Sequence, residues 1–185
     1  MRRPLLSALL VSVSVLGPAC IVEAPGGVSA NERRQAVVTQ VPTLSTRGGA
    51  NFDDAVELVG ANVQPGRLVP GDSARVTAYF KVLKALEEDY TLFVHVEDAE
   101  GRMERLNVDH KPAGGLYPTP QWKVGETVKD EFTLALPSGA TAQTVHVWMG
   151  FWDPKTDARL RLKNPEAVRN DGRDRILLMQ IPVGR

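Results

Sequence analysis

The sequence predicts an all-β protein, a single β-sandwich of about eight strands that follows a signal peptide and a flexible tether. Three observations support this prediction. From Asp54 onward, short apolar runs alternate with turn residues at a spacing typical of sandwiches. Within the runs, apolar and polar side chains alternate with a period of two. Helical turns are plausible only at residues 84–88 and 165–169, and both stretches are short.

The first 19 residues have the composition of a secretory signal peptide. Arg2 and Arg3 precede an apolar run over residues 5–16, and small residues follow it. A helix of that length covers about 18 Å, which is too short to cross a hydrocarbon core of about 30 Å. A basic start, a short apolar run and a small-residue boundary are typical of an export signal. The alternative is a buried helix at the start of a cytosolic fold.

Cys20, the one cysteine of the chain, lies at this boundary, so no internal disulfide can form. The residues before it are Leu16-Gly17-Pro18-Ala19. This stretch resembles the lipobox of bacterial lipoproteins, although Leu16 lies one position further upstream than usual. The resemblance implies a lipid anchor at Cys20. Since no acidic residue directly follows, it also implies export to the outer membrane. The alternative is ordinary cleavage after Ala19 or slightly later.

Residues 20–53 have the composition of a tether. Proline, glycine and small polar residues are frequent, and no period of 2 or 3.6 is sustained. All eleven aromatic residues lie at Phe52 or later, so residues 20–51 lack the side chains that dominate most cores. Such a segment reaches roughly 30 Å. We therefore expect a folded domain over residues 54–185, held clear of a membrane.

Turn chemistry separates the predicted strands. Pro65-Gly66 and Pro70-Gly71 each pair a residue of fixed φ with a permissive glycine, and Gly101 suits the end of a tight hairpin. Pro154 starts a further turn. We expect strands over residues 55–63, 74–82, 90–98, 103–108, 127–136, 144–152, 158–163 and 175–182.

Two of the late strands carry distinctive side chains on one face. Arg159, Arg161 and Lys163 alternate with leucines, so three cations are expected on an outer face. Such a face can resist edge-to-edge pairing of sheets, or it can bind an anionic polymer. Trp148 and Trp152 share a face of the preceding strand. Core packing explains at least one of these rings, and Trp152 is a candidate for stacking on a sugar.

The irregular segment 109–126 is the main candidate for a ligand site, because long loops on a β scaffold often carry function. Tyr117 and Trp122 can stack on the apolar face of a sugar ring, while Asp109, His110 and Gln121 supply hydrogen bonds. The alternative is that Trp122 closes one end of the sandwich, with its indole N–H bonded to the backbone.

Metal binding is a weaker possibility. His95 and Glu97 share a strand face, and Asp109 and His110 follow the next strand. Imidazole and carboxylate groups together can bind a divalent ion. They can equally form a hydrogen-bonded structural network, so we predict no metal site and keep these four residues only as candidates.

Three stretches of the chain resemble one family of β-sandwich modules. The stretches are residues 89–102, residues 109–130 (with Asp109-His110-Lys111-Pro112, Trp122-Lys123-Val124-Gly125-Glu126 and Asp130) and residues 150–160 (with Gly150-Phe151-Trp152-Asp153-Pro154). They resemble the soluble C-terminal domain of bacterial membrane glycosyltransferases of the protein-mannosyltransferase type. The resemblance covers residues 56–182 and implies an immunoglobulin-like or carbohydrate-binding-like sandwich. It implies no glycosyl transfer, because the membrane part of those enzymes has no counterpart here.

Charge and motifs narrow the functional classes. The 22 basic and 22 acidic residues balance, which argues against a nucleic-acid partner. No nucleophile elbow, phosphate-binding glycine loop or zinc-protease motif is present in the sequence. We therefore predict no enzymatic activity and no cofactor. The expected function is that of a cell-envelope lipoprotein, bound to a membrane by its lipid, that binds a glycan or envelope polymer. The alternatives are a structural lipoprotein that docks another envelope protein through a sheet face, and a hydrolase.

Overall fold

The computed structural model describes residues 27–184 of the chain; the predicted signal peptide and Cys20 lie outside the described residues. The strands are β1 (Val37–Val38), β2 (Thr46–Arg47), β3 (Asn51–Phe52), β4 (Val56–Gln64), β5 (Ser73–Val82), β6 (Thr91–Asp98), β7 (Leu106–Asn107), β8 (Thr127–Ala135), β9 (Thr144–Trp152) and β10 (Ile176–Pro182). The helices are α1 (Ala30–Ala36) and three short 3₁₀ segments, η1 (Pro112–Gly115), η2 (Thr119–Gln121) and η3 (Pro165–Ala167).

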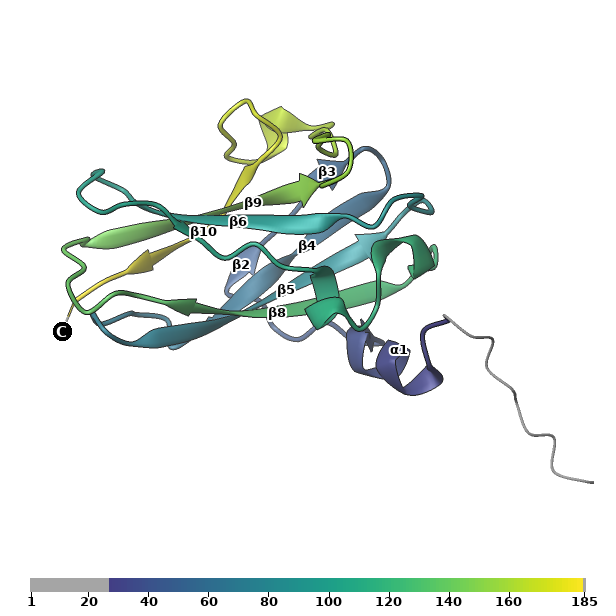
Figure 1. Ribbon diagram of the computed structural model, residues 1–185, viewed down its shortest axis with the longest axis horizontal. Coiled ribbons are helices and arrows are strands. Elements are labelled where there is room, and N and C mark those ends of the chain that lie inside the picture. The colour runs from purple at the N-terminus through teal and green to yellow at the C-terminus, as the bar shows by residue number, and fades with distance from the viewer. Residues whose placement is uncertain (1–26, 185) are drawn as a thin grey trace, which may run out of the picture.

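These strands form two antiparallel sheets that pack face to face (Figure 1). The first sheet has the order β1-β8-β5-β4-β2, and β3 also pairs with β4. The second sheet has the order β10-β9-β6-β7. The all-β sandwich predicted from the sequence is confirmed.

Period-two alternation explains why the long strands form. In β8, Val128, Phe132 and Leu134 are buried between the sheets, whereas Lys129 and Glu131 lie on the outer face. Each long strand thereby removes one row of apolar side chains from water, which stabilises the fold by about 25 cal/mol for each Å² buried.

Aromatic rings fill the centre of the sandwich. The ring of Phe151 in β9 lies edge-on to Phe52 and Phe80, with centroids 5.3 Å away in each case. All three side chains are fully buried. Because Phe52 and Phe80 belong to the first sheet and Phe151 to the second, these contacts hold the two layers together.

The segment predicted to be a tether differs from that expectation within the described residues. Helix α1 begins with a capping box, in which Ser29 and Glu32 satisfy each other's backbone N–H groups. Strand β1 then pairs with β8, and Ala50 and Phe52 are fully buried. The folded unit therefore begins well before residue 54, because short strands dock on a sheet already formed by longer ones.

Two of the eight predicted strands are reduced. Of residues 103–108, only Leu106–Asn107 pair as a strand. Residues 158–163 form isolated bridges, Trp152 with Arg159 and Phe52 with Leu162. The segment 158–163 contacts the second sheet at Arg159 and the first sheet at Leu162, so it cannot extend a ladder on either.

Within residues 27–184, no helix is long and apolar enough to cross a bilayer.

Candidate functional site

The aromatic rings of the 109–126 loop point into the protein. Tyr117 is 1% exposed and Trp122 is 2% exposed. The Trp122 ring lies 6.3 Å from Phe80 and 6.4 Å from Phe151, and its Nε1 donates to the Tyr117 carbonyl at 2.8 Å. Neither ring offers a face to a sugar, so the predicted stacking role of Tyr117 and Trp122 is wrong. The alternative prediction, in which Trp122 closes one end of the sandwich, is confirmed.

The Tyr117 hydroxyl organises this loop. Its oxygen lies 2.6 Å from the Gln121 carbonyl and 2.7 Å from the Glu126 carboxylate, so the single O–H proton is shared between these two acceptors. Burial and the hydrogen bond to Glu126 raise the pKa of Tyr117 to about 12. Glu126 also pairs with Arg33 of α1, so the loop and the helix are joined through one carboxylate.

The polar candidates of the loop serve the fold as well. Asp109 accepts from the Val94 backbone N–H at 2.8 Å, and Gln121 accepts from Val28 N–H at 3.0 Å. His110 places one ring nitrogen 2.7 Å from the Val108 carbonyl and the other 2.9 Å from Asp130. These bonds fix the ends of the loop and occupy part of the hydrogen-bonding capacity of all three side chains.

His110 and Asp130 form a partly buried ion pair. Burial favours the neutral imidazole, but the hydrogen bond and the charge of Asp130 outweigh it and raise the pKa of His110. Asp130, which is fully buried, also accepts from the Ala113 N–H at 2.8 Å. It thereby anchors η1, where Ala113 and Gly114 both have positive φ.

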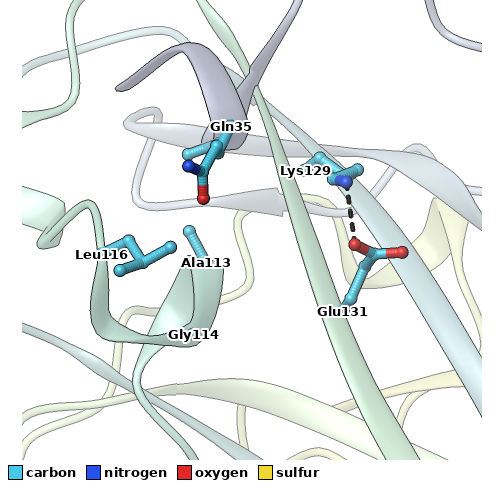
Figure 2. A pocket seen from close by; sticks show the side chains of 7 residues that line it. Gln35, Ala113, Gly114, Leu116, Lys129 and Glu131 are labelled. Atoms are coloured by element: carbon cyan, nitrogen blue, oxygen red, sulfur yellow. Dashed lines mark ion pairs between the residues drawn. The ribbon is translucent and has the colours of Figure 1, made fainter. Parts of the chain in front are cut away.

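A cavity of about 400 Å³ lies between α1, η1 and β8. Figure 2 shows Gln35 on one side, Ala113 and Leu116 on a second, and the ion pair of Lys129 with Glu131 on a third. That ion pair joins Nζ and Oε2 at 2.8 Å. The lining contains no nucleophile beside a base and no aromatic ring. The cavity therefore offers a few hydrogen-bonding groups and no arrangement suited to catalysis.

The four metal candidates do not converge. Both His95 and Glu97 contact the guanidinium of Arg175, at 3.1 and 2.8 Å, whereas Asp109 and His110 serve the contacts given above. Burial and the charge of Arg105 lower the pKa of His95. In the part of the chain that the structure describes, no three His, Cys, Asp or Glu residues are grouped so that they could hold a metal ion.

The outer face of the second sheet carries two aromatic rings under two arginines. The guanidinium of Arg159 lies 4.4 Å from the Phe93 ring, and that of Arg175 lies 4.9 Å from the Trp148 ring. Both rings are buried although they point away from the core. Gly150 permits this packing, since a Cβ there would lie 2.5 Å from the Phe93 ring.

Next to these rings runs the row of cations predicted from the sequence. Arg159, Arg161 and Lys163 are exposed, while Leu160 between the two arginines is buried. Within residues 27–184, none of the three cations takes part in an ion pair. We call these three residues the cationic row. The alternation predicted here is confirmed, although the segment is not a regular strand.

Trp152 lies beside the first cation of the row. It forms a bridge with Arg159, its ring is partly exposed, and its Nε1 donates to Asp157 at 2.8 Å. Arg159 is held in place by the Phe93 ring and by a hydrogen bond from Nη1 to the Arg173 carbonyl at 2.7 Å. A fixed guanidinium, with donors left over, therefore adjoins a partly exposed indole.

Comparison with known proteins supports the fold. No family model matches the chain, and no curated protein matches it. Among solved structures, the chain is similar to the C-terminal domain of wzt, at 12% identity and a TM-score of 0.50, over 77% of this chain and 83% of that one. At this identity the likeness shows the fold alone.

Two further solved structures show weaker similarity. One is AvmM, described as catalysing macrocyclization in alchivemycin A biosynthesis (15% identity, TM-score 0.36, over 78% of this chain and 97% of that one). The other is a CARDB domain from Pyrococcus furiosus in complex with di-metal ions (12% identity, TM-score 0.32, over 79% and 100%). Neither carries an argument about function. The likeness to the wzt C-terminal domain thus supports the fold and nothing further.

Proposed function

We propose that this protein is a non-enzymatic envelope lipoprotein whose sandwich binds an acidic glycan along residues 152–163. The observation that carries the proposal is the cationic row beside Trp152. A sugar ring presents C–H groups that stack on an indole, and a uronic-acid carboxylate matches the bidentate donors of arginine. The row supplies both kinds of contact within one segment.

Preorganisation supports Arg159 as the central contact. Its guanidinium is already stacked on Phe93 and bonded to the Arg173 carbonyl, so little side-chain entropy is lost when a ligand binds. The charge of the C-terminal part of the sequence is favourable too. Residues 155–185 contain eight basic and four acidic side chains, a net charge of +4, which attracts a polyanion.

The lipid anchor belongs to the same proposal. The basic start, the apolar run and Cys20 support export, removal of residues 1–19 and lipidation, with the outer membrane as the destination. Replacing Cys20 with Ser is expected to release the protein from membrane fractions into the soluble fraction. Membrane retention of Cys20→Ser equal to that of wild type would overturn the anchor.

Binding is tested with three polymers. The full chain in detergent is run by affinity electrophoresis through gels containing polygalacturonate, dextran or poly-glutamate. We expect polygalacturonate to retard the protein and dextran to have little effect. Poly-glutamate, which has the charge but no sugar ring, is expected to retard it less. Equal retardation by poly-glutamate and polygalacturonate would refute recognition of a sugar.

Matched variants locate the site. Arg159→Gln removes a charge-assisted contact of about 1.5–3 kcal/mol, so the affinity for polygalacturonate is expected to fall roughly tenfold or more. Trp152→Ala is expected to weaken binding of polygalacturonate but not of poly-glutamate. Arg75→Gln, an exposed arginine of β5, is the control and should leave the affinity unchanged. Release of new reducing ends from polygalacturonate would contradict the non-enzymatic proposal.

A further inference from the structure

The end of the sandwich opposite the C-terminus exposes apolar side chains. Among the described residues, the exposed large hydrophobic side chains are Leu83 (39% exposed), Leu116 (41%) and Val124 (62%). Leu83 follows β5, and the other two lie in the loop before β8. Both loops emerge at the end of the molecule where α1 lies, away from the C-terminus (Figure 1).

Hydrogen bonds bring these segments together. The Gly125 N–H donates to the Val82 carbonyl, and the Val82 N–H donates to the Glu126 carbonyl, both at 2.9 Å. The turn that carries Val124 therefore lies beside Leu83. The Tyr117 hydroxyl, next in the chain to Leu116, donates to the side chain of Glu126 in the same turn.

Lysines surround these apolar side chains. Lys81 donates to the Gly125 carbonyl, and Lys84 and Lys123 are exposed. None of the three takes part in an ion pair within the described part of the chain. We call these lysines, with Leu83, Leu116 and Val124, the apolar–lysine end.

Three of the neighbouring carboxylates are neutralised. Ion pairs join Glu126 to Arg33, Asp89 to Lys111 and Glu88 to Lys155. The acidic residues near Leu83 and Lys81 that have no ion pair among the described residues are Asp53, Asp54, Glu57 and Glu87. On the turn that carries Val124, Glu126 is paired, so the unpaired charge there comes from Lys81 and Lys123 and is positive.

The first described residues of the chain, which follow Cys20 in the sequence, lie at this end. Val28 donates its N–H to Gln121, in the same loop as Val124. Eight peptide units separate Cys20 from Val28, and they span at most about 28 Å when fully extended. A random coil of that length reaches roughly 16 Å. An anchor at Cys20 thus keeps this end of the sandwich close to a bilayer.

We propose that the apolar–lysine end rests on an anionic lipid surface, with Leu83 and Val124 at the depth of the headgroups. The inference depends on the proposed lipid anchor. Lysines near an anionic membrane are attracted to it, and exposed apolar side chains favour the interface. Because the anchor already holds the domain near the bilayer, the local concentration of lipid is high, and a small contact surface is sufficient to orient the domain. The sandwich then has a defined orientation relative to the bilayer.

Fluorescence of the lipidated full chain tests this orientation. The protein is reconstituted in vesicles of phosphatidylethanolamine and phosphatidylglycerol in a three-to-one ratio, some of which carry nitroxide headgroups. An environment-sensitive dye is attached through Val124→Cys. The matched control is Ser138→Cys, an exposed site beside Gly71 at the opposite end. Since the Cys20 sulfur carries the lipid, the dye labels the introduced thiol.

We expect a blue shift and strong nitroxide quenching at position 124, and neither at position 138. Lys84→Glu with Lys123→Glu should bring the quenching at 124 down toward the value at 138. Arg67→Glu with Arg75→Glu, two exposed sites at the far end, should leave it unchanged. A chain that floats with vesicles but shows equal quenching at 124 and 138 overturns the orientation alone. A chain that does not float overturns the anchor and the orientation together.

Discussion

Replacing Trp122 with Ala tests whether the 109–126 loop is part of the core. The indole is 2% exposed, packs against Phe80 and Phe151, and donates one hydrogen bond to the Tyr117 carbonyl. Removing a buried Trp side chain costs about 3–5 kcal/mol. For a domain whose total stability is about 5–15 kcal/mol, that loss is a large fraction. We expect Trp122→Ala to lower the melting temperature by roughly 10 °C.

Two further substitutions separate the contribution of the Trp122 ring packing from that of its hydrogen bond, and compare it with a partly exposed Trp. Trp122→Phe keeps most of the ring volume but leaves the Tyr117 carbonyl without its donor, so the expected cost is about 1–3 kcal/mol. Trp152→Ala removes a partly exposed ring and should cost less than about 1 kcal/mol. The assay is urea unfolding followed by circular dichroism. If Trp122→Ala costs no more than Trp152→Ala, the Trp122 ring does not fill the end of the sandwich and the reasoning is refuted.

Three other predictions concern the loop and the outer face. The pKa of His110 is raised by Asp130, so its contribution to stability is complete below pH about 6.5 and disappears as the pH rises through the folded pKa. The cost of His110→Gln, measured by urea unfolding, should therefore be greater at pH 5.5 than at pH 8.5, and an equal cost would argue against a charged pair. Gly150→Ala forces a Cβ against the Phe93 ring and should destabilise the fold by about 1–3 kcal/mol; an unchanged urea midpoint would show that the ring is free to move. The pKa of Tyr117 is raised to about 12, so the absorbance difference between wild type and Tyr117→Phe should show no phenolate near pH 10 while the chain is folded, and a phenolate band there would contradict the burial.

Strand β8 was predictable because one of its faces is buried and the other is exposed to water, and its period of two follows directly from that difference. In β9 the outer face is covered as well, so residues 147–151 are all buried although their side chains alternate in direction. The same alternation predicted the cationic row, because Leu160 is buried and the residues on either side of it therefore point outward. Predictions of this kind do not require knowing which strands lie side by side in the sheet.

The segment before residue 54 was harder to predict. Strands β1, β2 and β3 have two residues each, which is too short for any period to appear. Their stability comes from docking on β8 and β4. One signal was present in the sequence: Ser29 followed three residues later by Glu32 is the pattern of a capping box.

The candidate site was predicted only in part. Tyr117 and Trp122 belong to a loop rich in proline and glycine, and nothing local indicates that both rings turn inward. The burial of Trp122 depends on a space left by Phe80 and Phe151, which are distant in sequence. In contrast, Arg159 could be placed on a surface because its direction follows from the residues on either side.

Hydrogen–deuterium exchange of the full chain, with and without polygalacturonate, tests the proposed glycan site most directly. We predict that exchange slows over residues 152–163 when polygalacturonate is added, and that Arg159→Gln abolishes the effect. The amides of residues 109–126 should exchange at the same rate in both states. Protection of residues 109–126 instead of 152–163, or no protection at all, would contradict the proposal.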